Sequence, residues 1–174
     1  MVILSPLLIL VSIIITIDLK ATPIFKQYRM GMNGKEFSIY KFRTFRPNAP
    51  HNVPTNEIVD YSDYSTKTCI LLRGLSIDEL PQLINIIKGD MSFIGPRPVM
   101  LNEDELNSKR LALGIYSVRP GVTGWAQING RDKLNVDDKI KFDLEYIKNK
   151  SFKFDMYILF KTIEKVIKRE DIKS

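Results

Sequence analysis

The chain opens with an apolar run that has no polar face. "MVILSPLLILVSIIITI" precedes the first charged residue, Asp18. As a straight helix it would be about 25 Å long at about 1.5 Å per residue, close to the roughly 30 Å of a bilayer's hydrocarbon core. A helix that is apolar all round is hard to bury in a small domain, so the pattern favours membrane insertion over a core helix. Lys20, Lys26 and Arg29 follow the run, which predicts that its downstream side faces the cytoplasm.

The pair Ser5-Pro6 lies inside this run. Proline removes a backbone donor and clashes with the preceding turn, so we expect a kink there. A basic leader and a small-residue cleavage site are both missing, which argues against a signal peptide. The pattern divides the chain into a membrane-inserted helix over residues 1–20 and a cytoplasmic catalytic domain over residues 21–174.

After Pro23 the apolar positions partly alternate. Residues 24–29 and 36–42 are rich in aromatic side chains, and the glycines between them predict a small β-hairpin. A long loop with three prolines follows, and it contains His51.

Helical spacing dominates the rest of the chain. It predicts helices over residues 78–88, 102–113, 135–149 and 152–169, together with a short helix within 61–72. The last long helix has an apolar stripe opposite a basic face, so it could pack on the core or lie in the membrane interface. The predicted fold class is therefore α+β, mainly helical, with one small hairpin and amphipathic interfacial helices.

The helix over 78–88 has two candidate starts. With Ser76 as N-cap, Glu79 completes a capping box, but Pro81 then costs one internal hydrogen bond. With Asp78 as N-cap, Pro81 falls in the first turn without that cost. We favour the second start. Either start puts Asp78 at the positive end of the helix dipole, which helps to keep its carboxylate ionised.

Composition excludes several kinds of chemistry. The formal charge of +6 suits nucleic acid, anionic lipid or phosphorylated substrates. The basic residues are spread along the chain and form no recognised nucleic-acid motif, so we predict no nucleic-acid partner. Cys69 and His51 are the only residues of their types. A disulfide, a cysteine metal cluster, a catalytic triad and a multi-histidine zinc site are therefore not expected.

The stretch "RGLSIDELPQLINIIKGDMSFIGPRP" holds adjacent carboxylates, Asp78 and Glu79, with arginines on either side. One interpretation is an ordinary capped helix with solvated charges. The other is a site for a metal ion and a phosphate. The second gains support because four arginines lie in loops rich in glycine and proline, where a fixed guanidinium can bind phosphate oxygens through two hydrogen bonds. These arginines are Arg73, Arg97, Arg119 and Arg131.

Two carboxylates would repel an incoming phosphate unless a cation lay between them. Mg²⁺ prefers oxygen ligands and shares them with substrate phosphates. The pattern thus predicts phosphoryl transfer on a diphosphate, with Asp78 or Glu79 as nucleophile or metal ligand. Trp125 in "TGWAQ" could stack on a base or sugar, although such an aromatic more often anchors its loop to the core.

Three blocks in order resemble the bacterial sugar transferase family, the monotopic phosphoglycosyl transferases. They are "PIFKQYRMGMNGKEFSIYKFRT", "RGLSIDELPQLINIIKGDMSFIGPRP" and "VRPGVTGWAQINGRD". The closest likeness is to enzymes that initiate capsule, O-antigen or other glycan assembly. The likeness covers nearly the whole chain, from the Ser-Pro pair to the last helix.

The resemblance implies a reaction and a place. A UDP-sugar gives its sugar-1-phosphate to polyprenyl (undecaprenyl) phosphate at the cytoplasmic face of the bacterial plasma membrane, UMP leaves, and downstream glycosyl transferases are possible partners. It implies Asp78 as nucleophile of a covalent phospho-sugar intermediate, Glu79 as metal ligand or proton carrier, and Mg²⁺ as cofactor. Phosphates would be bound by Arg73, Arg97 and Arg119, with Lys41 and Arg131 added to that set.

The resemblance also implies a re-entrant helix that bends at Ser5-Pro6 and returns to the same face. Family members carry a first half-helix ahead of that pair, whereas residues 1–4 precede it here. Two other functions stay open. One is a non-catalytic membrane-bound scaffold of glycan assembly, and the other is a glycosyl transferase that releases UDP.

Overall fold

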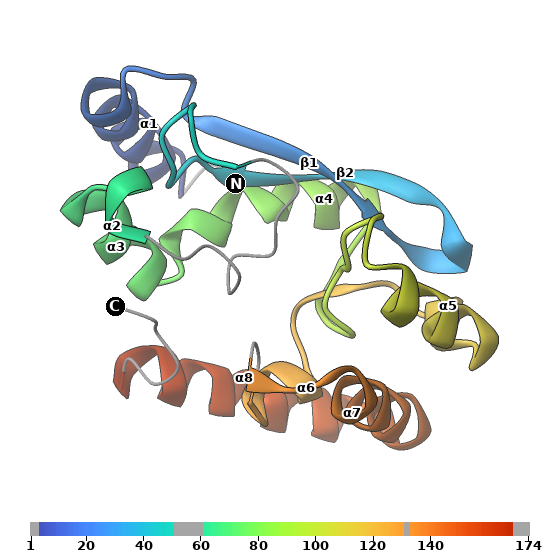
Figure 1. The fold of residues 1–174 in the computed structure, drawn as a ribbon. Coiled ribbons are helices and arrows are strands. Elements are labelled where there is room, and N and C mark those ends of the chain that lie inside the picture. Colours follow the sequence, from blue (N-terminus) through green and yellow to red (C-terminus); the bar gives the residue numbers. More distant parts are fainter. Residues whose placement is uncertain (1–3, 51–60, 131–132, 169–174) are drawn as a thin grey trace.

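The computed structural model describes residues 4–50, 61–130 and 133–168. His51 and Arg131, both named above, lie outside these ranges. Two layers face one another in Figure 1, with the hairpin and the helices beside it above and the helix α8 below.

The predicted hairpin is confirmed. β1 (Ile24–Met30) pairs antiparallel with β2 (Glu36–Phe42), from Ile24 opposite Phe42 to Met30 opposite Glu36. The 3₁₀ helix η2 (Met32–Gly34) makes the turn, in which Asn33 and Gly34 adopt φ values of 59° and 70°. Glycine adopts such values at little cost, and asparagine tolerates them better than most residues.

The apolar run forms the helix α1 (Ser5–Leu19). Pro6 lies in its first turn, where proline costs no internal hydrogen bond, so the described part of the helix has no proline-induced kink in its interior. Val11, Ile15 and Leu19 are buried against Phe42 and the helix α3. In the described ranges, no helix has both the length and the apolar character that crossing a bilayer requires.

The middle of the chain forms short helices. They are α2 (Tyr61–Tyr64), α3 (Lys67–Gly74), the 3₁₀ helix η4 (Ile77–Gln82) and α4 (Leu83–Lys88). The expected helix within 61–72 is thus confirmed as α2 and the start of α3. The expected helix over 78–88 exists, but its first half is a 3₁₀ helix.

A second small sheet was not predicted. β3 (Ser92–Ile94) pairs in parallel with β4 (Gly121–Thr123), both within segments expected to be turns or loops. The two backbones approach so closely that a Cβ on Gly121 would lie 2.1 Å from the Gly95 nitrogen, and one on Gly124 would lie 2.0 Å from the Gly95 oxygen. Glycine is required here because no other residue leaves room for this contact.

The predicted helices of the C-terminal half are confirmed as α5 (Asp104–Ala112), α7 (Val136–Asn149) and α8 (Phe152–Lys168). The 3₁₀ helix η5 (Ile115–Ser117) and α6 (Trp125–Ile128) were not predicted, and α6 lies where a loop was expected. Ile158 of α8 is fully buried with Ile94, Ile128 and Tyr146, whereas Phe160 and Ile167 of the same helix are exposed. The helix therefore packs on the core and still presents an apolar face outward.

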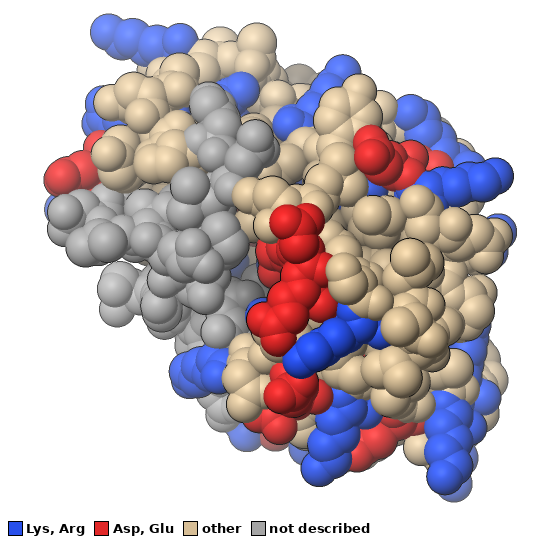
Figure 2. Space-filling model, turned by 45° about the vertical axis from the view of Figure 1, so that its right-hand side comes forward, with Lys and Arg blue, Asp and Glu red and all other residues tan. Residues whose placement is uncertain are grey.

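Charge is mixed on the face shown in Figure 2. Acidic side chains gather in its middle, and basic side chains lie around them. This face is therefore not uniformly basic.

Candidate active site

The Asp78-Glu79 pair lies in η4, between α3 and α4. Ser76 precedes the turn at φ 54°, without a side-chain cap. The favoured start at Asp78 is therefore wrong. Ser76 is the N-cap, as in the other candidate start, but the expected capping box is not formed. Pro81 and Gln82 are buried at the end of η4, which holds the turn on the body of the molecule.

Asn85 fixes this segment to the hairpin. Its carboxamide oxygen accepts a hydrogen bond from the Tyr40 backbone at 3.0 Å, and its nitrogen donates to the Ser38 carbonyl at 2.7 Å. The side chain is fully buried. A buried amide with its partners satisfied in this way specifies one geometry, so η4 and α4 are held in register with β2.

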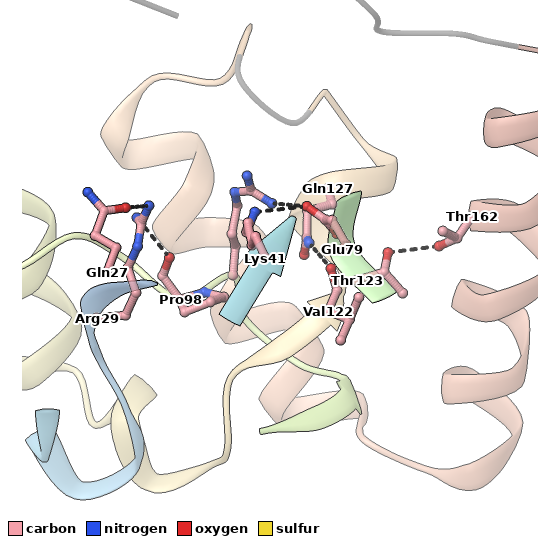
Figure 3. Close-up of polar contacts among 10 residues, drawn as sticks. Gln27, Arg29, Lys41, Glu79, Pro98, Val122, Thr123, Gln127 and Thr162 are labelled. Atoms are coloured by element: carbon pink, nitrogen blue, oxygen red, sulfur yellow. Dashed lines mark hydrogen bonds and ion pairs between the residues drawn. The ribbon is translucent and has the colours of Figure 1, made fainter. Parts of the chain in front are cut away.

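Two cations from different elements meet Glu79. The Lys41 Nζ lies 3.1 Å from its Oε1, and an Arg97 guanidinium nitrogen lies 3.8 Å from the same oxygen. Figure 3 shows Lys41 reaching Glu79 from β2. The Glu79 side chain is 12% exposed and that of Arg97 35% exposed, so the contact is shielded on the Glu79 side and open on the other.

Burial and the nearby charge of Arg97 disfavour the charged forms of Lys41 and Arg29. Burial lowers the pKa of Lys41, and the Arg97 charge lowers it further, while Glu79 and Asp78 oppose both effects. Burial also lowers the pKa of Arg29 to about 10, again helped by Arg97. Two cations, Lys41 and Arg97, therefore contact one shielded carboxylate, and the charge of Arg97 also acts on Arg29. Clustered cations of this kind are suited to an anion.

The Pro96-Arg97-Pro98 turn is fixed by hydrogen bonds to its backbone carbonyls. Its two prolines have no N–H to donate. All four carbonyls from Pro96 to Val99 accept hydrogen bonds from distant parts of the chain. The donors are the Gly121 nitrogen at 2.9 Å, Arg110 at 2.7 Å, Arg29 at 3.4 Å and the Met30 nitrogen at 3.0 Å, in chain order of the carbonyls. These four hydrogen bonds fix the turn and make it rigid.

A cavity of about 260 Å³ adjoins this cluster, between η4 and α8. Arg73, Glu79 and Arg97 supply charge to its wall, and Lys165 of α8 adds another cation. Most of the remaining wall is apolar, from Leu80, Leu83, Phe93, Val122, Ile128, Leu159 and Val166. Its size is near the lower end for a small-ligand pocket.

The structure brings together four of the residues named from the sequence. Arg73, Glu79 and Arg97 line the cavity, and Lys41 binds Glu79. Arg73 also lies 4.9 Å from the ring of Phe45, which orients its guanidinium. Asp78 precedes Glu79 on the same turn, and its charge acts on Lys41.

Arg119 lies elsewhere. Its Nε donates to the Gly89 carbonyl at 2.8 Å in an exposed contact, and it is not among the described residues that line the cavity. Arg131 lies outside the described ranges.

Sequence reasoning missed Arg29 and Lys165 as parts of this site. Arg29 is on β1, where the partial alternation gave no sign that its guanidinium turns back toward the Pro98 carbonyl. Lys165 belongs to the basic face of the last helix, and that basic face was the sequence feature that could have indicated its place in the site.

Trp125 is an anchor, as its more common role suggested. Its Nε1 donates to Glu145 of α7 at 2.9 Å, and its ring lies 5.0 Å from that of Phe154. It is not among the described residues around the cavity.

Carboxylates are the groups in this site that could hold a hard cation. Within the described residues, no three acidic, histidine or cysteine side chains gather as a metal site. Asp78 and Glu79 offer oxygen ligands of the type that Mg²⁺ takes when substrate phosphates complete its coordination.

A cationic cluster beside a carboxylate pair and an apolar cavity is suited to a protein that handles phosphorylated substrates. The bacterial sugar transferase family matches residues 1–169, and the chain belongs to this family. The resemblance carried by the three sequence blocks is therefore confirmed.

Individual relatives agree with this assignment. The chain is 39% identical to an uncharacterized sugar transferase, EpsL, of Bacillus subtilis, over 98% of this chain and 82% of that protein. It is 38% identical to the UDP-glucose:undecaprenyl-phosphate glucose-1-phosphate transferase of Escherichia coli, over 92% of this chain and 36% of that protein. It is 36% identical to the UDP-N-acetylgalactosamine-undecaprenyl-phosphate N-acetylgalactosaminephosphotransferase of Aeromonas hydrophila, over 94% of this chain and 40% of that protein. The chain thus spans less than half of the last two relatives.

Proposed function

We propose that this chain is a phosphoglycosyl transferase that moves a sugar-1-phosphate from a UDP-sugar to polyprenyl phosphate and releases UMP. The observation that carries the proposal is the contact of Lys41 and Arg97 with Glu79, directly after Asp78 and beside the cavity. The printed names of the Escherichia coli and Aeromonas relatives support the choice of substrates.

The reaction has two steps in this proposal. The Asp78 carboxylate attacks the β-phosphorus of the donor, the bond from that phosphorus to the bridging oxygen breaks, and UMP leaves with the bond's electron pair. An oxygen of the lipid phosphate then attacks the same phosphorus and expels the Asp78 carboxylate. The arginines of the site stabilise the charge on the phosphoryl oxygens in both steps, and two easier displacements replace one.

Each cation has a role in this scheme. Arg97 is held by its turn so that its guanidinium faces the phosphates without prior reorganisation. Lys41 orients Glu79, whose carboxylate would help Asp78 to hold Mg²⁺ or would assist proton transfer. Mg²⁺ bound at these carboxylates would neutralise part of the negative charge of the diphosphate.

Membrane contact belongs to the same proposal. The side of α1 away from the core exposes Ile9 and Ile17 at 60% and 71%, and α8 exposes Ile167 at 76%. Exposed apolar helices of this kind are suited to a lipid interface. We place α1 in the cytoplasmic leaflet of the plasma membrane as a re-entrant element around Ser5-Pro6, with the catalytic domain on the cytoplasmic side.

The nucleotide product tests the proposal. The chain, purified in lipid particles, is mixed with Mg²⁺, polyprenyl phosphate and a panel of UDP-sugars. We expect UMP with one of the sugars and none from the Asp78→Asn variant. Release of UDP would contradict the reaction and indicate a glycosyl transferase. No nucleotide from any sugar would favour the scaffold.

A further inference from the structure

We propose that the cavity between η4 and α8 receives the first isoprene units of the acceptor lipid, with the lipid phosphate at the cationic end. The inference rests on the proposed function and adds to it the place of one substrate. Glu79, Thr123 and Thr162 line this cavity, and in Figure 3 Glu79 lies on one side of Thr123 and Thr162 of α8 on the other.

The far wall is suited to hydrocarbon. Most of its polar groups already bond within the protein: the hydroxyls of Thr123 and Thr162 lie 2.8 Å apart, and the Gln127 amide nitrogen donates to the Val122 carbonyl at 2.9 Å. Thr162 also donates to the Ile158 carbonyl. The buried carboxamide oxygen of Gln127 is the exception, because it has no partner among the described residues. A nucleobase would bring several N–H and carbonyl groups against this wall, where the Gln127 carboxamide oxygen could accept one hydrogen bond, and burying the other groups without partners is costly. A branched hydrocarbon needs only close apolar contact.

The other end is suited to an anion. Arg73 and Arg97 line the cavity beside Glu79, and Lys165 reaches it from α8. Among the described residues of the wall, three are cations and one is a carboxylate. A phosphate joined to an apolar chain is complementary to both ends of this cavity, whereas a nucleoside is complementary to one.

The mouth is also apolar. Phe93 lines the cavity and is still 56% exposed. Leu75 is exposed beside Ser76, which forms part of the wall. Phe93 and Leu75 therefore offer apolar contacts to a lipid that leaves the cavity.

Filling the cavity tests the inference. Leu159→Trp and Val166→Trp place a large ring in the wall from two positions of α8. Leu113→Trp is the control, because Leu113 is half exposed after α5 and is not among the residues that line the cavity. Two readouts are made on each protein: UMP released from the UDP-sugar without acceptor, and transfer to polyprenyl phosphate.

The donor step and the acceptor step should respond differently to the two cavity substitutions. We expect the UMP release without acceptor to stay within about twofold of wild type, and kcat/KM for the acceptor to fall by about tenfold or more, as loss of a few apolar contacts implies. Leu113→Trp should change neither. Equal loss of both readouts in the two cavity variants would overturn the inference and assign the cavity to the donor. Unchanged acceptor kinetics in both would also overturn it.

A binding measurement tests the inference independently of catalysis. Farnesyl phosphate binding is measured in the same preparations. Weaker binding in both cavity variants, but not in Leu113→Trp, supports the inference even if no UMP is released by any protein. Equal binding to all four proteins would overturn it. Failure of the proposed function is seen separately, as absence of UMP from wild type.

Discussion

Arg110 joins Asp143 to the backbone of Arg97. One guanidinium nitrogen of Arg110 donates to the Arg97 carbonyl at 2.7 Å, and the other donates to Asp143 at 2.6 Å. The side chains of the pair are 3% and 2% exposed. A buried ion pair between α5 and α7 therefore fixes the backbone of the turn that places Arg97 beside the cavity.

This pair is predicted to position Arg97. Removing one partner would leave a buried charge and cost about 3–5 kcal/mol, whereas replacing both by apolar residues is often nearly neutral. We expect Arg110→Met with Asp143→Leu to unfold near wild type in urea, yet to lose about tenfold in kcat/KM because Arg97 is no longer held.

A double-mutant cycle separates positioning from a general structural role. In an Arg97→Ala background, the same pair of substitutions should lower activity no further, because the group that they position has gone. If the losses in free energy of activation simply add, the positioning role is wrong.

The lowered pKa of Lys41 predicts that activity falls at alkaline pH. Its pKa is lowered, chiefly by burial, so its proton leaves below the ordinary lysine value of about 10.4. Once it is neutral, the ion pair with Glu79 is lost and the rate should fall. Lys41→Arg keeps the charge and should move this fall to higher pH in a pH–rate profile.

The free energy of unfolding should change in the opposite direction. Between the lowered folded pKa and the unfolded value, the unfolded state binds more protons at Lys41, so this group's contribution rises with pH. Urea unfolding from neutral pH to about pH 10 should show that rise in wild type relative to Lys41→Arg. Parallel curves for the two proteins would show that burial of Lys41 does not affect its titration.

Trp125 is predicted to stabilise the fold without touching substrate. Trp125→Ala should lower the free energy of unfolding by no more than about 3–5 kcal/mol, since the ring contacts with Phe154 and its neighbours are lost. Trp125→Phe loses the hydrogen bond to Glu145 and should cost about 1 kcal/mol. A Trp125→Phe enzyme of unchanged stability but raised KM for the UDP-sugar would contradict this role.

Local patterns predicted the hairpin and the long helices well, because their periodicity reports burial directly. The same reasoning failed over residues 78–88. The predicted apolar face includes Ile87, which is 69% exposed, while Asn85 is fully buried. Asn85 is buried because its amide satisfies backbone groups of β2, and no local pattern signals a partner more than forty residues away.

The second sheet was missed for a related reason. β3 and β4 have three residues each and lie among glycines and prolines. Such strands are defined by pairing over a long separation and carry almost no periodicity. Of the site, the sequence signalled the residue types and the stiff Pro-Arg-Pro turn, but it did not show that Arg29 and Arg110 hold that turn or that α8 closes the cavity.

The proposed reaction requires a covalent intermediate on Asp78, which the intact mass of the protein detects. Wild type is incubated with Mg²⁺ and the UDP-sugar that it uses, without acceptor. We expect an added mass of one sugar-phosphate, located on the peptide containing Asp78, absent in Asp78→Asn and removed when polyprenyl phosphate is added. UMP release and product formation without any adduct, or an adduct on Glu79, would contradict it.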